Sequence, residues 1–330
     1  MTVTNLKRTF AATIGVLLVA TFASAFFIAK KQNRSHNRFV TSAQGVNVVS
    51  DPGIFKKVYV ISDVHGMYDN LLALLKAAQI VDGNGDWIAA NSLLVIAGDS
   101  IDKGPQSIEV LSLWVKLQGQ ARLAQGDLIH TLGNHEAEFL ADPADDKKAQ
   151  ALLNEMKSKG LPLTDLTGRT SDRGTFIHDE PVALIVGRWL FSHSGFYPQM
   201  SWSDFSIKAS DVIARGAYSD PLLIGDDSIL EAKDWEKSPD TLQVLLSRLD
   251  SLALYGEVFG HQPGAFGIQG RSAAKAEGRL IKIDNGMAPE AGSHPGSVLV
   301  FANPKEMNAN SYPTVQVILP DGSISPLNPE

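Results

Sequence analysis

Residues 58–75 read VYVISDVHGMYDNLLALL, and this stretch sets a pattern that the rest of the chain repeats. Four apolar residues, Val58 to Ile61, are typical of a short buried strand. The helix expected after it is marked by four closely spaced leucines, Leu71, Leu72, Leu74 and Leu75. The turn between strand and helix, Ser62 to Gly66, carries an aspartate and a histidine. A strand, a polar turn and a helix in this order predict the first unit of an α/β domain.

The alternation of strand-like and helix-like segments continues along the chain. Residues 93–96 and 128–132 are expected strands on either side of an expected helix at 108–117, which completes a β-α-β-α-β order. The second half is richer in strands, which we expect at 182–186, 189–192, 258–259, 280–283, 298–301 and 315–318. The first two of these form a predicted hairpin turning at Gly187-Arg188, and the region from Ser201 to Ser238 is expected to be loop-rich. The pattern predicts an α/β domain with a second sheet packed on the first.

The N-terminus carries a long apolar run, Thr9 to Ala29, with Lys and Arg on both sides of it. Its length suits one membrane span, and Ala23-Ser24-Ala25 offers a cleavage site for a signal peptidase. We therefore expect residues 1–30 to be a membrane anchor or a signal peptide, residues 31–55 a linker, and residues 56–330 the main folded domain. This predicts an inner-membrane-anchored or exported protein whose folded domain lies on the periplasmic, extracytoplasmic side.

Composition narrows the classes of function. The formal net charge is −7 and no basic patch is visible, so we expect no nucleic-acid partner. The chain has no cysteine, which excludes disulfides, thiolate metal sites and a cysteine nucleophile. Absence of cysteine also fits an oxidising compartment.

Asp, Asn and His gather in five loops, each of which follows an apolar strand. The residues of interest there are Asp63, His65, Asp99, Asn134, His193 and His261. Loops at strand ends are where α/β sheets form their sites. Oxygen and imidazole ligands without sulfur suit divalent Mn, Fe or Zn. We therefore predict two divalent metal ions that share one bridging carboxylate and clamp the attacking and leaving oxygens of an in-line displacement.

These loops, taken in order, resemble a known family. The motifs are Asp63-x-His65, Gly98-Asp99-x-x-Asp102-x-Gly104, Gly133-Asn134-His135-Glu136, His193-x-Gly195 and Gly260-His261. Together they resemble the phosphoprotein phosphatase group of the calcineurin-like metallophosphoesterases, over about residues 58–301. Within that group the chain is most similar to the Shewanella-like phosphatases. Leu132 stands where the eukaryotic serine/threonine enzymes place Arg, and residues 283–287 resemble a late Shewanella-like segment.

The resemblance implies a fold and a set of roles. The fold is α/β, with two packed mixed β-sheets flanked by helices, so residues 56–330 become a metallophosphatase domain behind an N-terminal hydrophobic helix. The implied ligands of the first metal are Asp63, His65 and Asp99. Those of the second are Asp99, Asn134, His193 and His261, with Asp99 as the bridge. His135 is implied as the acid that protonates the leaving oxygen, and Asp102 as the carboxylate that orients its ring.

Two lysines depart from the family pattern. Lys103 follows the second Asp of the Gly-Asp-x-x-Asp motif, where the family usually has Arg. Lys233 lies in the segment that resembles the region of a second phosphate-binding Arg. Arg holds phosphate as a bidentate fork, whereas Lys acts as a point charge. The resemblance still implies that Lys103, Lys233 and Asn134 bind the substrate phosphate.

The implied function is a binuclear-metal phosphomonoesterase that works by direct attack of a metal-bridging water. Its expected substrate is a phosphorylated protein, on tyrosine or on serine/threonine, or a small phosphomonoester, with the membrane as a second partner through the N-terminus. One alternative is a nucleotide hydrolase similar to diadenosine tetraphosphate hydrolases. Another alternative is a non-catalytic, membrane-anchored binding module on a phosphatase scaffold.

Overall fold

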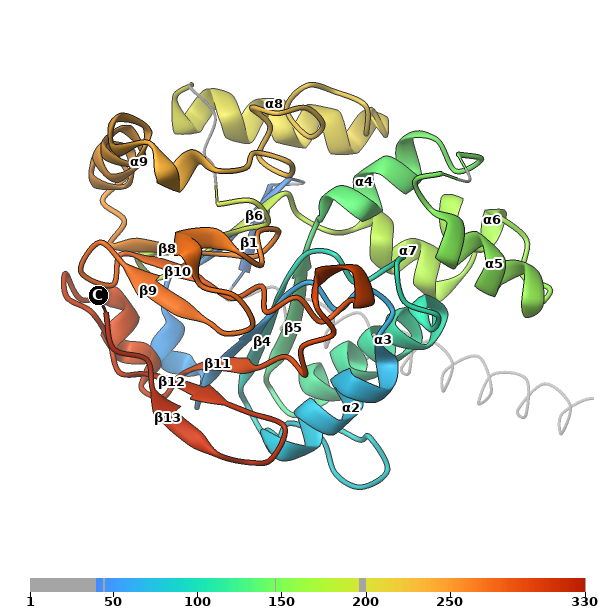
Figure 1. The fold of residues 1–330 in the computed structure, drawn as a ribbon, viewed down its shortest axis with the longest axis horizontal. Helices are drawn as coiled ribbons and strands as arrows, with labels where there is room; N and C mark the ends of the chain where they lie inside the picture. Colours follow the sequence, from blue (N-terminus) through green and yellow to red (C-terminus); the bar gives the residue numbers. More distant parts are fainter. Residues whose placement is uncertain (1–39, 44, 146, 196–199, 330) are drawn as a thin grey trace, which may run out of the picture. The chain divides into compact units, whose positions relative to one another are not determined.

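In the computed structural model, which describes residues 40–43, 45–145, 147–195 and 200–329, two mixed β-sheets lie between layers of helices (Figure 1). The described strands are β1 (Val40–Ala43), β2 (Val46–Val49), β3 (Val58–Ile61), β4 (Leu93–Ala97), β5 (Asp127–Thr131), β6 (Ala183–Val186), β7 (Trp189–Ser192), β8 (Gly256–Phe259), β9 (Ala273–Lys275), β10 (Leu280–Lys282), β11 (Val298–Phe301), β12 (Val315–Ile318) and β13 (Ile324–Pro326). The described α-helices are α2 (Tyr68–Ala77), α3 (Ser107–Leu123), α4 (Asn134–Ala141), α5 (Gln150–Ser158), α6 (Thr164–Thr167), α7 (Asp172–His178), α8 (Trp202–Arg215) and α9 (Pro239–Ser251). Short 3-10 helices occupy Pro52–Ile54, Trp235–Lys237, Ala265–Gly267, Pro289–Ala291 and Pro304–Asn308. The predicted two-sheet architecture is confirmed.

The first sheet is built around three parallel strands. Its order is β13-β12-β11-β3-β4-β5, and β3, β4 and β5 run parallel with Val60 opposite Val95. Parallel neighbours need long crossovers, which α2 and α3 provide. These helices cover one face of the sheet, where Leu71 and Leu74 of α2 are fully buried together with Ile96 of β4. The β-α-β-α-β order predicted from the sequence is therefore confirmed.

The second sheet has the order β1-β2-β6-β7-β8-β10-β9. β6 and β7 form the predicted antiparallel hairpin, with Ala183 opposite Ser192, whereas β7, β8 and β10 run parallel. Helices α8 and α9 cover this sheet: Phe205 of α8 and Leu245 of α9 belong to the same buried cluster as Leu190 of β7. The helices on the two sheets therefore lie on opposite sides of the molecule (Figure 1).

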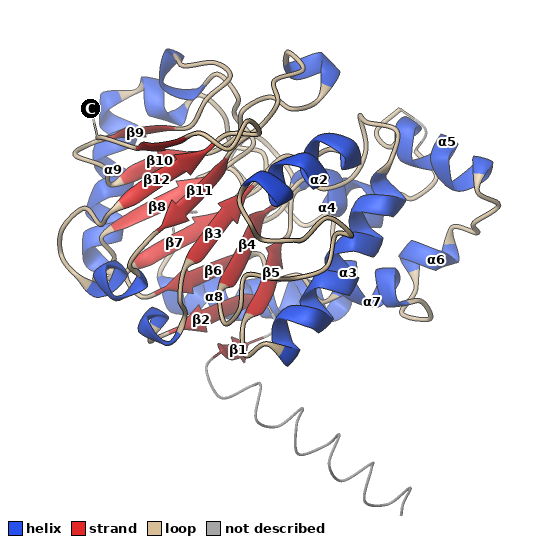
Figure 2. Cartoon of the chain, turned by 90° about the horizontal axis from the view of Figure 1, so that it is seen from below, coloured by secondary structure: helices blue, strands red, loops and turns tan. Residues whose placement is uncertain are grey.

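Aromatic residues fill the space between the two sheets, whose strands stack in Figure 2. Phe301 of β11 lies with its ring centroid 5.2 Å from Trp189 and 6.2 Å from Phe191, both on β7. All three side chains are fully buried. Burial of one such side chain is worth about 1.5–3 kcal/mol. These contacts join the sheets and fix where their strand ends meet.

The region from Ser201 to Ser238 was expected to be loop-rich, and this expectation is wrong in part. Helix α8 begins after Ser201, whose hydroxyl accepts the Asp204 N–H, and ends at Gly216 in the left-handed conformation. Its buried face carries Phe205, Ala209 and Val212 at helical spacing, while most of its other residues are polar. A helix with so narrow an apolar face therefore looked like a loop. The predicted linker, residues 31–55, also needs correction, because β2 lies inside it and pairs in parallel with β6.

The N-terminal prediction falls mainly on residues that the structure does not describe. The apolar run Thr9 to Ala29, and with it the predicted hydrophobic helix, lies outside the described residues. Among the described residues, no helix is both long enough and apolar enough to cross a bilayer. On this finding the predicted location, inner-membrane-anchored or exported with a periplasmic domain, is wrong. The membrane is not supported as a partner. The remaining domain boundaries stay a prediction.

Candidate metal centre

Strand ends from both sheets meet at the candidate site. Asp63 and Asp99 follow the parallel strands β3 and β4, and Asn134 opens helix α4 just after β5. His193 and His261 follow the parallel strands β7 and β8 of the other sheet. Parallel strands end at the same edge of their own sheet. The packing of the two sheets then brings these edges together, so that the His261 N–H donates to Asp63, 198 positions away in the sequence.

The backbone at these strand ends is held in an unfavourable conformation. Asp63, His65, Asp99 and His261 have φ values of 52°, 47°, 54° and 63°, all in the left-handed region. Such a conformation costs a non-glycine residue about 1–3 kcal/mol and gathers at functional sites. Four strained residues, in loops from both sheets that meet at the candidate site, therefore indicate that the loops are shaped for a ligand.

One group of ligand atoms surrounds His65. Its Nδ1 lies 3.3 Å from the Ile101 carbonyl oxygen, which directs Nε2 toward the carboxylates. Nε2 lies 3.5 Å from Asp99 Oδ2 and 3.9 Å from Asp63 Oδ1. Burial lowers the pKa of His65 to about 3, so the imidazole is neutral. The lone pair of a neutral nitrogen is repelled by two nearby carboxylates. A metal ion bound between them would replace this repulsion by attraction.

A second group surrounds His193, which is completely buried. Its Nδ1 lies 2.8 Å from the Ala97 carbonyl oxygen, while Nε2 lies 3.0 Å from Asn134 Oδ1 and 3.3 Å from Asp99 Oδ1. Ligand atoms about 2.1 Å from one ion lie about 3.0–3.4 Å apart, which matches these distances. Although burial alone lowers it, the Asp99 carboxylate raises the pKa of His193 to about 10, so the pocket favours positive charge.

His261 completes the second group. Its ring centroid lies 5.0 Å from that of His193, and its Nε2 lies 3.3 Å from the Glu231 carbonyl oxygen. Burial and the charge of His193 lower the pKa of His261 to about 2. A neutral imidazole tied at Nε2 leaves Nδ1 for a metal ion.

Asp99 joins the two groups. Its Oδ2 faces His65 and its Oδ1 faces His193. Ligand atoms of His65, Asp99 and His135 lie within 4.8 Å of one another, and so do those of Asp99, His193 and His261. Against the effect of burial, the neighbouring histidines hold the pKa of Asp99 well below its usual range. One ionised carboxylate shared by two clusters is what a bridging ligand requires.

The first cluster differs from the ligand set implied by the sequence, since it contains His135 in place of Asp63. Both oxygens of Asp63 accept the His261 N–H, at 3.0 Å each, and burial and Asp284 raise the pKa of Asp63 well above its usual range. His135 directs Nδ1 toward Asp102, at 3.5 Å from Oδ2. His65 Nε2 nevertheless faces Asp63, and His135 already has a carboxylate partner, so Asp63 stays a predicted ligand.

Glycines leave room for the candidate ligands. A Cβ atom at Gly133 would lie 2.2 Å from Asp99 Oδ1, and one at Gly260 would lie 2.2 Å from Asp63 Oδ2. A Cβ at Gly98, whose φ is 81°, would lie 2.5 Å from His193 Nδ1. No side chain fits at such distances, so the glycines of the motifs are needed for the close approach of loop and ligand.

The predicted acid and its partner lie beside the clusters. The His135 ring centroid is 4.9 Å from that of His65, and its side chain is 13% exposed, so it borders the open side of the site. Burial lowers the pKa of His135, but Asp99 and Asp102 outweigh burial and raise it. Asp102 is itself fixed, because Oδ1 accepts the N–H groups of Ala151 and Leu152.

The two predicted phosphate-binding lysines lie on different sides of the clusters. Lys103 Nζ lies 3.1 Å from His65 Nε2, at the first cluster. Lys233 is exposed, and its charge makes a small contribution to the lowered pKa of His261, at the second cluster. The structure therefore places Lys103 in contact with the first cluster, whereas the phosphate-binding role of Lys233 stays a prediction.

Glu136 and Asp284 were not assigned a role from the sequence. The fully buried Glu136 carboxylate accepts the N–H groups of Asp99, Ser100, Ile101 and Gly133, at 2.8–3.2 Å. It therefore fixes the loop that carries Asp99. Asp284 follows β10 at the same sheet edge, and burial raises its pKa to about 6. The predicted ligands were found because they follow strands closely. Asp284 follows β10 in the same way, so this signal could have found it as well.

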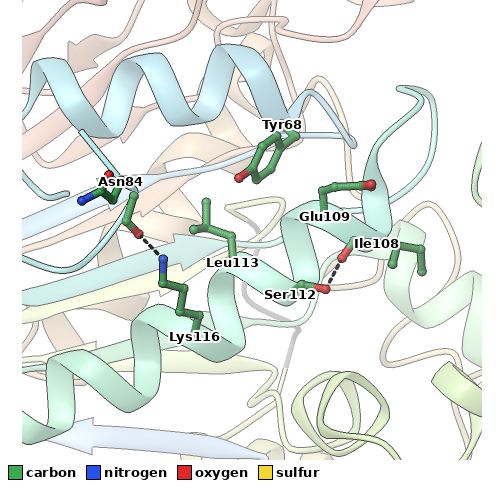
Figure 3. Close-up of a pocket in the computed structure, with 8 residues that line it drawn as sticks. Tyr68, Asn84, Ile108, Glu109, Ser112, Leu113 and Lys116 are labelled. Atoms are coloured by element: carbon green, nitrogen blue, oxygen red, sulfur yellow. Dashed lines mark hydrogen bonds between the residues drawn. The ribbon is translucent and has the colours of Figure 1, made fainter. Parts of the chain in front are cut away.

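A hollow of about 250 Å³ lies elsewhere, between α2 and α3 (Figure 3). It is lined by Tyr68, Asn84, Gly85, Ile108, Glu109, Ser112, Leu113 and Lys116. The predicted site residues, all of which are described, do not line it. Lys116 closes one wall through bonds to Gly85 and Asp86. The hollow is therefore separate from the candidate metal centre.

The fold and the metal centre together define a metal-dependent hydrolase of phosphoric esters. The chain belongs to the calcineurin-like phosphoesterase family, whose sequence profile matches residues 56–268. Members of this family use two divalent metal ions, as predicted for this chain, and the identity of the ions stays open. Because the family is enzymatic, the non-catalytic alternative is set aside.

Individual proteins resemble the chain over parts of its length. Shewanella-like protein phosphatase 1 of Plasmodium berghei is 34% identical over 80 residues, 24% of this chain and 22% of that protein. A symmetrical bis(5'-nucleosyl)-tetraphosphatase of Enterobacter is 29% identical over 158 residues, 47% of this chain and 49% of that enzyme. The chain thus spans less than half the length of either relative. A cold-active protein-tyrosine phosphatase of a psychrophilic Shewanella species shares the fold, with a TM-score of 0.67 and 21% identity over 88% of this chain and 83% of that one.

Proposed function

We propose that the chain is a binuclear-metal phosphomonoesterase acting on phosphorylated proteins. The observation that carries the proposal is the Asp99 carboxylate, which faces His65 with one oxygen and His193 with the other. In the proposed site Asp63, His65 and Asp99 would hold the first ion, and Asp99, Asn134, His193 and His261 would hold the second. Two such ions would supply the positive charge that activates a water molecule and neutralises the phosphate.

The chain's own side chains would then handle the substrate. Lys103, which contacts His65, and Lys233 would attract the phosphate oxygens as point charges, and the Asn134 amide could contact them from the start of α4. His135 holds a proton on the open side of the site, where Asp102 orients its ring. On departure of the alcohol, that proton passes to the leaving oxygen. Proton donation by His135 helps most when the leaving group needs a proton, as the serine oxygen does.

Two lines of support bear on the substrate. The similarity to a Shewanella-like protein phosphatase favours a phosphoprotein. The similarity to a symmetrical bis(5'-nucleosyl)-tetraphosphatase covers a longer stretch and keeps a nucleotide hydrolase as the second candidate. The two candidates differ in the bond that is cleaved, a phosphomonoester in one and a phosphoanhydride in the other.

A substrate comparison separates them. Purified protein is assayed with added Mn²⁺ on a phosphotyrosine peptide, a phosphoserine peptide and diadenosine tetraphosphate. The Asp99→Asn variant, prepared in parallel, controls for contaminating phosphatases. We expect kcat/KM to be highest on a phosphopeptide and the control to be inactive. A preference for diadenosine tetraphosphate that disappears in the control would establish the second candidate in place of the first.

A further inference from the structure

A lysine is buried completely behind the metal centre. Lys282, the last residue of β10, is 0% exposed and is among the largest fully buried side chains of the described chain. Lysine is almost never fully buried unless its ammonium group is paired. Here Nζ donates to three backbone carbonyls, those of Pro263 at 2.5 Å, Ile268 at 2.6 Å and Asp284 at 3.1 Å. All three protons of the ammonium group are therefore used.

The three carbonyls belong to the loops that follow β8 and β10. Pro263 comes two residues after His261, and Ile268 directly follows the short 3-10 helix within the same loop. Asp284 begins the loop after β10, and β10 pairs in parallel with β8, with Lys282 opposite Phe259. β8 and β10 are neighbours in Figure 1. The ammonium group thus ties the His261 loop to the strand beside it.

The His261 loop needs such a tie. His261 itself has a φ of 63°, which a free loop would relax. Its N–H is held by Asp63, and the next residue, Gln262, is held through its side chain by Ser194 and Asp234. These bonds fix the start of the loop. The rest of the loop is bound by Lys282, whose Nζ donates to the carbonyls of Pro263 and Ile268. Hydrogen bonds from a charged donor are about twice as strong as neutral ones, so these two bonds hold this part of the loop strongly.

We propose that Lys282 is a positioning residue of the metal centre, which holds the His261 loop so that the imidazole meets the second metal ion. The inference rests on the proposed role of His261 as a ligand. Burying an ammonium group in a strand costs free energy that an apolar side chain would not. Its three bonds, to the loop that carries His261 and to the adjoining strand end, account for its presence.

The test is the metal content of Lys282→Met, which keeps most of the side-chain length and removes the N–H donors. After exhaustive dialysis we expect the wild type to retain two ions per chain and the variant one. The Mn²⁺ concentration that gives half of the metal-induced rise in Tm should increase about 10–100-fold, the usual effect of removing an outer-shell partner of a metal ligand. If Lys282→Met does not fold, Lys282→Gln, which keeps amide donors, should show a smaller loss in the same direction.

Two controls separate positioning from general destabilisation. Ile281→Ala removes a fully buried neighbour on the same strand and should lower the Tm of the metal-free protein while leaving two ions bound. In a His261→Ala background, Lys282→Met should cause no further loss of metal affinity, because the ligand that it positions is gone. Equal ion loss in Ile281→Ala, or full retention of both ions in Lys282→Met, overturns the inference. A wild type with fewer than two ions overturns the proposed function and the inference with it.

Discussion

Replacing His135 with Asn should separate acid catalysis from metal binding. In the structure His135 borders the open side of the site, with Nδ1 3.5 Å from Asp102 Oδ2 and a raised pKa. A positioned acid contributes about 10²–10⁴-fold to the rate when the leaving group needs a proton. We therefore expect His135→Asn to lower kcat on phosphoserine by about 10²–10⁴-fold. The loss on p-nitrophenyl phosphate should be much smaller, because nitrophenolate leaves without a proton.

The assay compares kcat on both substrates, together with the metal content of each preparation. His135 is protonated, and so can act as an acid, only below its pKa. Because the protonated form is lost as pH rises through this pKa, phosphoserine turnover of the wild type should fall at high pH. That decline should be absent in the variant. Equal losses on both substrates with both ions retained would refute the acid role. Loss of one ion would instead make His135 a ligand, as its place in the first cluster allows.

Four further changes test other parts of the site and the fold. Asp99→Asn should lower kcat the most of all single changes and should reduce the content of both ions in metal analysis. Lys103→Ala should raise KM for aryl phosphates, and an unchanged KM and kcat would show that Lys103 does not contact phosphate. Asp102→Asn should repeat the His135→Asn pattern more weakly and shift the decline of phosphoserine turnover to lower pH. Burial raises the pKa of Glu257 from 4.5 to about 7, so this group stabilises the fold fully below pH 4.5 and loses that contribution as pH rises through 7. Chemical unfolding at pH 5 and pH 9 measures how far the free energy of unfolding falls over this range. In Glu257→Gln, which cannot ionise, that fall should be about 3 kcal/mol smaller than in the wild type. A fall of equal size in both proteins would contradict the raised pKa of Glu257.

The strands that carry the site could be predicted because they are buried on both faces. β3 and β4 are continuous apolar runs, each followed at once by a polar turn, and such runs are visible without knowledge of the fold. The order of the turns then placed Asp63, Asp99 and His193 at strand ends. Parallel pairing, which the crossover helices impose, was enough to predict that the first two lie together.

Other features depend on contacts that the sequence does not display. Lys282 looks like a surface residue until β10 is placed beside β8, since its partners lie up to 19 positions away. Glu136 looks like an ordinary acid in the first turn of a helix, and only the folded loop shows that it accepts four N–H groups. Helix α8 was missed because its polar surface hides three buried positions, although the capping Ser201 and the terminal Gly216 were available as signals.

Metal analysis of active protein tests the central claim most directly. Purified wild-type protein is dialysed, its metal content is measured by mass spectrometry, and its activity on p-nitrophenyl phosphate is followed during chelation and restoration with Mn²⁺. The account predicts two ions per chain and activity that is lost with the ions and regained with them. In Asp99→Asn it predicts a reduced content of both ions and no activity. Full activity in a protein that holds one ion or none would contradict it.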